Sequence, residues 1–171
     1  NFPISDTVNL FNNNYRIDYL SNFMKIITIS SAIFVLLSST KYVQIININK
    51  IEYPILILSS ILGMMVMISS NDLILFYVGL ELQSLALYVL ASFNRDNLLS
   101  SESGLKYFVL SALSSGLLLY GCSLIYGFSG STNFFIIRDA LVQDSYGLTF
   151  GIVFILVGLA FKISAVPFHM W

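Results

Sequence analysis

Apolar residues in this chain fall in long blocks that are separated by short polar segments. Each block is near the ~20 residues that an α-helix needs to cross a bilayer, and no strand-like alternation recurs. We therefore expect an all-α, polytopic transmembrane helix bundle in which about five helices are visible. The predicted spans cover residues 22–39, 52–69, 73–92, 104–127 and 146–166.

The segment before the first block is polar and rich in asparagine. Residues 1–21 are accordingly predicted to form an extramembrane lead, and residues 22–171 to form the transmembrane domain. The later connectors contain charged and turn-forming residues, for example at positions 70–72 and 94–97, which is typical of the ends of spans.

Composition agrees with a chain that is solvated by lipid. Hydrophobic residues make up 57% and charged residues only 10%, against roughly 25% charged residues in a soluble domain. The mean hydropathy is +0.83. A net charge of -1 without any cluster of Lys or Arg excludes a nucleic-acid partner.

The chain offers few groups that could hold a metal or a cofactor. It has a single cysteine, Cys122, and a single histidine, and it lacks a glycine-rich phosphate loop. We expect no metal site and no cofactor on this chain, and Cys122 is interpreted as a small core residue.

Glu81 lies near the middle of the third predicted span, where a charged side chain costs at least ~2.5 kcal/mol. Tyr77, Ser84 and Tyr88 are spaced so that they share its helix face, which predicts that Glu81 faces protein or trapped water. It is interpreted as a proton carrier, because burial favours a neutral carboxyl group whereas a nearby cation favours the carboxylate. The alternative is a structural ion pair that holds helices together.

Lys162 lies late in the fifth predicted span, on a face that also carries Gly151, Gly158 and Ala165. Small residues let a neighbouring backbone approach closely. Pro167 cannot continue the helical hydrogen bonds, so the helix is expected to break about one and a half turns beyond the lysine. A lysine beside a broken helix is typical of ion sites in transporters, although Lys162 could instead extend to the membrane interface.

Other polar positions have both a functional and a local interpretation. His169 could relay protons at neutral pH or only make local hydrogen bonds. Lys106 follows Glu102 by four residues, the spacing of an ion pair that can clamp a helix end. Ser111 and Ser115 are interpreted as part of a helix-packing face rather than a site.

Three stretches carry a family resemblance when they are taken together: GLELQSLALYVLA at 79–91, ESGLKYFVLSALSSG at 102–116 and GLAFKISAVPFHMW at 158–171. They resemble the antiporter-like membrane-arm subunits of respiratory complex I, NADH:ubiquinone oxidoreductase. The third stretch resembles subunit 2 of that complex more than its sister subunits 4 and 5. The resemblance covers roughly residues 15–171 and implies that the five spans correspond to helices three to seven of that family.

The resemblance also implies which residues move protons. Glu81 is similar to the carboxylate of the fifth helix, Lys106 to the lysine of the sixth, and Lys162 to the central lysine of the broken seventh. The chain would then be part of a subunit, and we expect a second chain to complete it after Trp171.

The implied function is proton translocation, with Lys162 storing a proton and Glu81 approaching or withdrawing. The chain would act within NADH:ubiquinone reductase without redox chemistry of its own, since NADH, FMN, iron-sulfur clusters and ubiquinone bind other subunits. Its partners would be other membrane-arm subunits, and its location the mitochondrial inner membrane or, alternatively, the bacterial plasma membrane. A subunit of a monovalent cation/proton antiporter and a structural membrane scaffold are the alternative functions.

Overall fold

The structure is a computed structural model, and it describes residues 7–45, 51–142 and 146–168. These ranges contain a short hairpin and six helices. In chain order the elements are β1 (Val8–Leu10), β2 (Tyr15–Ile17), α1 (Tyr19–Ile45), α2 (Glu52–Ile68), α3 (Leu73–Ala91), α4 (Leu98–Ser129), α5 (Phe134–Ala140) and α6 (Tyr146–Lys162).

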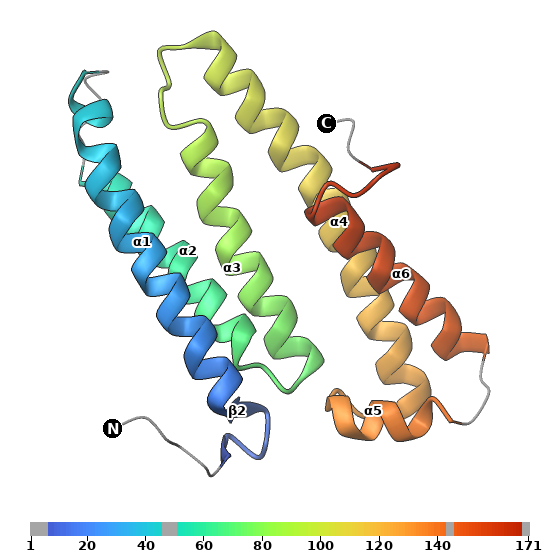
Figure 1. The fold of residues 1–171 in the computed structure, drawn as a ribbon. Helices are drawn as coiled ribbons and strands as arrows, with labels where there is room; N and C mark the ends of the chain where they lie inside the picture. Colours follow the sequence, from blue (N-terminus) through green and yellow to red (C-terminus); the bar gives the residue numbers. More distant parts are fainter. Residues whose placement is uncertain (1–6, 46–50, 143–145, 169–171) are drawn as a thin grey trace.

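The long helices form two groups. Figure 1 shows α1, α2 and α3 side by side as one group and α4 with α6 as the other. The short α5 lies across one end of α4 and α6. The closest packing is between α4 and α6 and between α2 and α3, and contacts between α3 and α4 join the groups. The predicted all-α helix bundle is thereby confirmed.

Length and composition separate the helices into two classes. Within the described residues, α1, α3 and α4 are long and apolar enough to cross a membrane. The other two apolar helices, α2 and α6, have 17 residues each, which is the lower end of the ~17–25 residues that span a bilayer.

Glycines bring the helix backbones together at two crossings. A Cβ on Gly63 of α2 would lie 2.8 Å from the carbonyl oxygen of Gly79 on α3, and a Cβ on Gly121 of α4 would lie 2.8 Å from that of Gly151 on α6. Close backbone approach replaces the hydrophobic driving force that helices lose in lipid. Small residues therefore permit the close contact at these two crossings.

The polar lead contains two short strands, which the all-α prediction did not include. The strands β1 and β2 pair in an antiparallel hairpin in which Val8 faces Ile17. The first helix begins at Tyr19 rather than at position 22, because Asp18 caps it. The Asp18 Oδ1 accepts from the backbone N–H of Ser21 at 2.9 Å, and Ser21 Oγ accepts from the N–H of Asp18 at 2.9 Å. Two backbone donors at the helix start are thus satisfied.

Asp72 and its neighbour Asn71 hydrogen-bond three segments at the end of the bundle where the hairpin lies. Its Oδ1 accepts from the backbone N–H of Ile74 at 2.9 Å and caps α3, while its Oδ2 accepts from the hydroxyl of Thr132. Beside it, the N–H of Asn71 donates to the carbonyl of Asn14 in the lead at 2.8 Å. The lead, the α2–α3 turn and the α4–α5 turn therefore meet at one point.

The connector between the last two predicted spans contains a helix that the sequence analysis missed. The seven residues of α5 begin after Asn133, whose side chain accepts from the N–H of Phe135 at 3.0 Å. A segment of this length has too few turns to show a helical period. The fourth helix also extends further than predicted, because Asn97 caps it at Leu98, ahead of position 104.

The last helix ends earlier than predicted. Lys162 is the final residue of α6, whereas the break was expected near position 166. Ser164 has a φ of 53°, its N–H donates to the carbonyl of Phe161 at 3.2 Å, and the N–H of Ala165 donates to that of Ala160 at 2.9 Å. This pair of bonds is the Schellman closure of a helix end. The chain leaves the helix before the residue preceding proline, for which the helical conformation is disfavoured.

Candidate functional site

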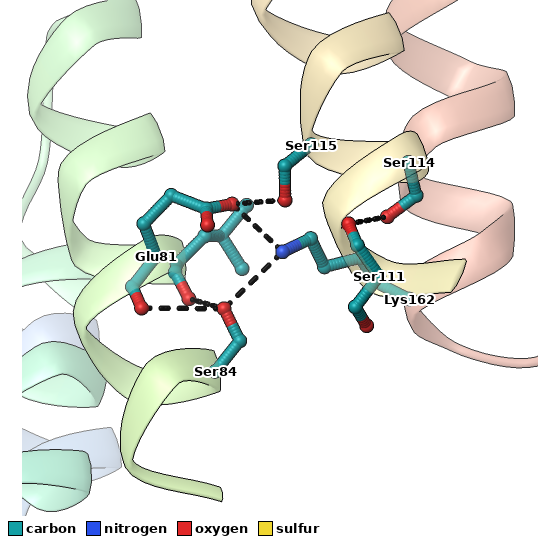
Figure 2. A network of polar contacts seen from close by, with 7 residues as sticks. Glu81, Ser84, Ser111, Ser114, Ser115 and Lys162 are labelled. Carbon is teal, nitrogen blue, oxygen red and sulfur yellow. Dashed lines mark hydrogen bonds and ion pairs between the residues drawn. The ribbon is translucent and has the colours of Figure 1, made fainter. Parts of the chain in front are cut away.

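Glu81 and Lys162 meet inside the bundle. Lys162 lies in the last turn of α6, and its Nζ donates to Oε1 of Glu81 on α3 at 2.8 Å and to Oγ of Ser84 at 3.2 Å. Figure 2 shows the ammonium group between these two side chains. Because α4 separates the helices in sequence, only the packing of α3 and α6 on α4 brings them together.

The fourth helix supplies a further partner for the carboxylate. Ser115 Oγ donates to the same Oε1 of Glu81 at 2.6 Å (Figure 2). The interpretation of Ser115 as a packing residue outside the site is therefore wrong. Hydrogen bonds to a carboxylate are shorter and stronger than those between neutral groups. A carboxylate within a span needs hydrogen-bond donors. The serines around position 115 are such donors, and this could have predicted a contact with Glu81 from the sequence.

Neighbouring serines on α4 do not join the pair in the same way. Ser114 Oγ is fully buried and donates to the backbone carbonyl of Ser111 at 2.9 Å. Ser111 and Ser114 therefore line the crossing of α4 with α6, as the sequence analysis expected for Ser111, while Ser115 alone among the three donates to Glu81.

Little of the ion pair is exposed. The side chain of Lys162 is 10% exposed and that of Glu81 is 21% exposed. Glu81 faces protein, as predicted from its helix face. The alternative in which Lys162 extends to the membrane interface is wrong, because its ammonium group points into the bundle. Charges removed from water in this way are costly unless they are paired and hydrogen-bonded, and both conditions are met.

The position of Lys162 depends on a small residue one turn earlier. A Cβ on Gly158 would lie 2.8 Å from Cβ of Leu118 and 3.0 Å from the carbonyl oxygen of Ser114 on α4. The predicted close approach at the glycine face of this helix is confirmed. The early end of α6 then leaves Lys162 in the last turn, where the partial negative charge of the helix C-terminus favours a cation.

Of the other two predicted site residues, the structure describes Lys106. Lys106 Nζ is 2.5 Å from Oε1 of Glu102, and the two side chains are 62% and 52% exposed. The pair predicted from their spacing is confirmed, but it lies apart from Glu81 and Lys162. His169 falls outside the described residues, and its role stays a prediction.

An apolar cluster closes the site on the side of α5. Leu118 is fully buried, and the cluster also includes a leucine of α3 and residues of α5 and α6. Its buried members are Leu73, Leu118, Cys122, Ile125, Ile137 and Leu148. In the described part of the chain, no three His, Cys, Asp or Glu side chains come together in a way that could hold a metal ion.

The fold and the site define a multi-pass helical membrane protein in which a lysine and a glutamate from different helices form an ion pair. Charged residues inside such bundles are candidates for functional sites. Comparison with known sequences names the family. Residues 70–171 match the transmembrane family described as NADH:quinone oxidoreductase/Mrp antiporter, and the chain belongs to this family.

Relatives in bacteria are similar over nearly the whole chain. NADH-quinone oxidoreductase subunit N of Pelagibacter ubique (strain HTCC1062) is 75% identical over 100% of this chain. Subunit N of Maricaulis maris (strain MCS10) is 55% identical over 99% of it. The chain spans 36% of the length of each of these two relatives. The resemblance to antiporter-like subunits of complex I is thereby confirmed.

Two solved respiratory membrane complexes contain chains with a similar fold. Respiratory complex I from Thermus thermophilus contains a chain with a TM-score of 0.80 and 29% identity, matched over 97% of this chain and 35% of that one. The membrane-bound sulfane sulfur reductase, an archaeal respiratory membrane complex, contains a chain with a TM-score of 0.65 and 29% identity, matched over 70% of this chain and 24% of that one.

The predicted second chain beyond Trp171 stays a prediction.

Proposed function

We propose that this chain is part of a proton-translocating membrane-arm subunit of an NADH:quinone oxidoreductase, and that Glu81 and Lys162 form the proton-carrying pair of a half-channel. The observation that carries the proposal is the 2.8 Å contact between Lys162 Nζ and Glu81 Oε1, largely enclosed by helices. The family match and the relatives called subunit N support it.

The pair provides a physical means of binding and releasing a proton. Two opposite charges about 4 Å apart interact by on the order of 4 kcal/mol at an effective dielectric constant near 20. With Glu81 close, the charged form of Lys162 is stabilised. When the carboxylate withdraws, that stabilisation is lost and the ammonium group can release its proton. Ser115 holds the carboxylate on the α4 side and Ser84 accepts from the lysine.

Redox chemistry belongs to other subunits in this proposal. NADH, FMN, iron-sulfur clusters and ubiquinone bind there, and quinone reduction drives the separation of Glu81 from Lys162. Lys106 adds a third charge at the α3–α4 end, and other membrane-arm subunits are the partners. The location is the bacterial plasma membrane, because the similar curated proteins are bacterial, rather than the mitochondrial inner membrane.

Replacing Lys162 by Ala tests the proposal in the complete complex, reconstituted in vesicles. Fewer protons should be pumped per NADH oxidised, because the proton-storing group is gone. Lys41→Ala is the control, since Lys41 is exposed on α1 and lies outside the pair. An unchanged proton-to-NADH ratio in Lys162→Ala would contradict the proposal.

A monovalent cation/proton antiporter subunit is the second candidate, because the family description includes Mrp antiporters. Purification decides between the two. Flavin and iron-sulfur signals with NADH oxidation would accompany only complex I. A purely structural scaffold is the third candidate, and normal pumping after neutralisation of Glu81, Lys106 and Lys162 together would favour it.

A further inference from the structure

A stripe of polar side chains runs along α3 from the ion pair to the α3–α4 end. Glu81, Ser84, Tyr88 and Ser92 are spaced three, four and four residues apart, so they share one helix face. That face packs on α4. Glu81 accepts from Ser115 of α4, and the Cβ of Ser92 fills the space beside Gly104 of α4. Polar side chains therefore lie along the interface between α3 and α4.

Tyr88 is the unusual member of this stripe. It is 5% exposed, and its ring packs edge-on against Tyr107 and Phe108, with centroids 4.8 and 5.8 Å away. Its hydroxyl has no hydrogen-bond partner among the described residues. Leaving a buried polar group unpaired costs about 1–3 kcal/mol. A phenylalanine would make the same ring contacts without that cost, so the ring packing does not explain the hydroxyl.

Along α3, Tyr88 lies on the side of the ion pair that faces away from the apolar cluster around Leu118. Toward α5 the pair is closed by the apolar cluster around Leu118, and Tyr77, the next polar side chain of α3 on that side, packs against this cluster. Toward the α3–α4 end the next side chains of the same face are Ser84 and then Tyr88. Tyr88 follows Ser84 by one turn, or about 6 Å along the axis. Aromatic side chains of helices tend to lean toward the N-terminus, and Ser84 is the next polar residue of α3 in that direction.

We propose that the Tyr88 hydroxyl is a hydrogen-bonding step of the proton path, between Lys162 and the α3–α4 end of the bundle. This inference rests on the proposed function of the pair. A proton arriving from that end binds the phenol oxygen while the phenol's own proton leaves, through Ser84 or a water molecule, for the neutral amine of Lys162. The O–H bond formed replaces the O–H bond broken, and Tyr88 ends in its starting state.

Ser84 decides whether this step is open. In the structure Ser84 Oγ accepts from Lys162 at 3.2 Å and lies 2.7 Å from the carbonyl oxygen of Leu80, to which it donates. Its proton is therefore engaged with a carbonyl of its own helix. Rotation of this hydroxyl, or entry of one water molecule, connects Tyr88 with Lys162. The path through Ser84 is thus closed in the observed arrangement, because the Ser84 proton is engaged with Leu80.

Tyr88→Phe in the complete complex tests the inference, since it keeps the ring and removes only the hydroxyl. We expect proton pumping to fall roughly tenfold, less than the 10²–10⁴-fold typical of a positioned acid or base, because water can replace part of its role. The solvent deuterium isotope effect on pumping should rise, which a change in packing alone would not produce. Tyr120→Phe is the control, because Tyr120 is 53% exposed on α4 and packs edge-on against Phe154.

Lys162→Ala is measured alongside, so that the two proposals fail separately. Wild-type pumping in Tyr88→Phe together with a defect in Lys162→Ala would overturn the role of Tyr88 and leave the proposed function in place. Wild-type pumping in Lys162→Ala would overturn the proposed function. A Tyr88→Phe complex that fails to assemble would show a structural role and would also overturn this inference.

Discussion

Lys162 and Glu81 form an ion pair over 2.8 Å although they lie 81 positions apart in the sequence. The same carboxylate oxygen also accepts from Ser115 at 2.6 Å. Three helices therefore meet at one oxygen atom, so a change in the packing of any of them alters the site.

Glu81→Gln should destabilise the bundle by about 2–3 kcal/mol. Breaking a fully buried pair by removing one partner costs about 3–5 kcal/mol, and the partial exposure of both side chains lowers this value. Adding Lys162→Met in the double variant should recover much of the loss, since no unpaired charge remains, while pumping stays low. Thermal unfolding of the purified complex measures the first effect. A double variant less stable than both single variants would contradict the prediction.

Ser115→Ala should lower proton pumping partially and leave the helices in place. The change removes a hydrogen bond to a charged group, of a kind worth about 1.5–3 kcal/mol, but it leaves Lys162 beside Glu81. Ser114→Ala is the matched control on the same helix, because the Ser114 hydroxyl donates to a backbone carbonyl instead. Proton pumping per NADH is the measurement, and equal effects of the two variants would refute a specific role for Ser115.

Gly121→Ala should disturb the crossing of α4 and α6, whereas Gly116→Ala on the same helix should be tolerated. A Cβ at position 121 meets the carbonyl oxygen of Gly151 at 2.8 Å and the backbone nitrogen of Ile155 at 2.9 Å, while a Cβ at position 116 meets nothing within 4 Å. Overpacking costs typically about 1–3 kcal/mol. Thermal stability of the complex measures the difference, and a Gly121→Ala variant as stable as Gly116→Ala would disprove it.

Lys106→Gln and Glu102→Gln distinguish a proton-carrying lysine from a helix-end clamp. Both substitutions remove the same exposed ion pair, so a clamp predicts equal and small effects. We expect Lys106→Gln to lower pumping and Glu102→Gln to leave it unchanged, because only the lysine adds a protonatable cation to the path. Matching pumping rates in the two variants would identify the pair as structural.

Much of the bundle was predictable because a helix in lipid must satisfy its backbone internally and present apolar side chains outward. The five apolar blocks follow from this rule, and so does the inward direction of Glu81. Spacing within a helix also gave the pair of Glu102 and Lys106 and the close approach at Gly158. Each of these features depends on residues within a few turns of one another.

The tertiary structure alone decided the features that join distant parts of the chain. The partner of Glu81 depends on how α3 and α6 pack on α4, and the role of Ser115 depends on that same crossing. The end of α6 at Lys162 depends on the two backbone bonds that close the helix around Ser164. Helical period fixes which face a side chain lies on, but the choice of neighbour for that face is a property of packing. For this reason the sequence indicated the charged residues, and only the packed helices showed which of them form a pair.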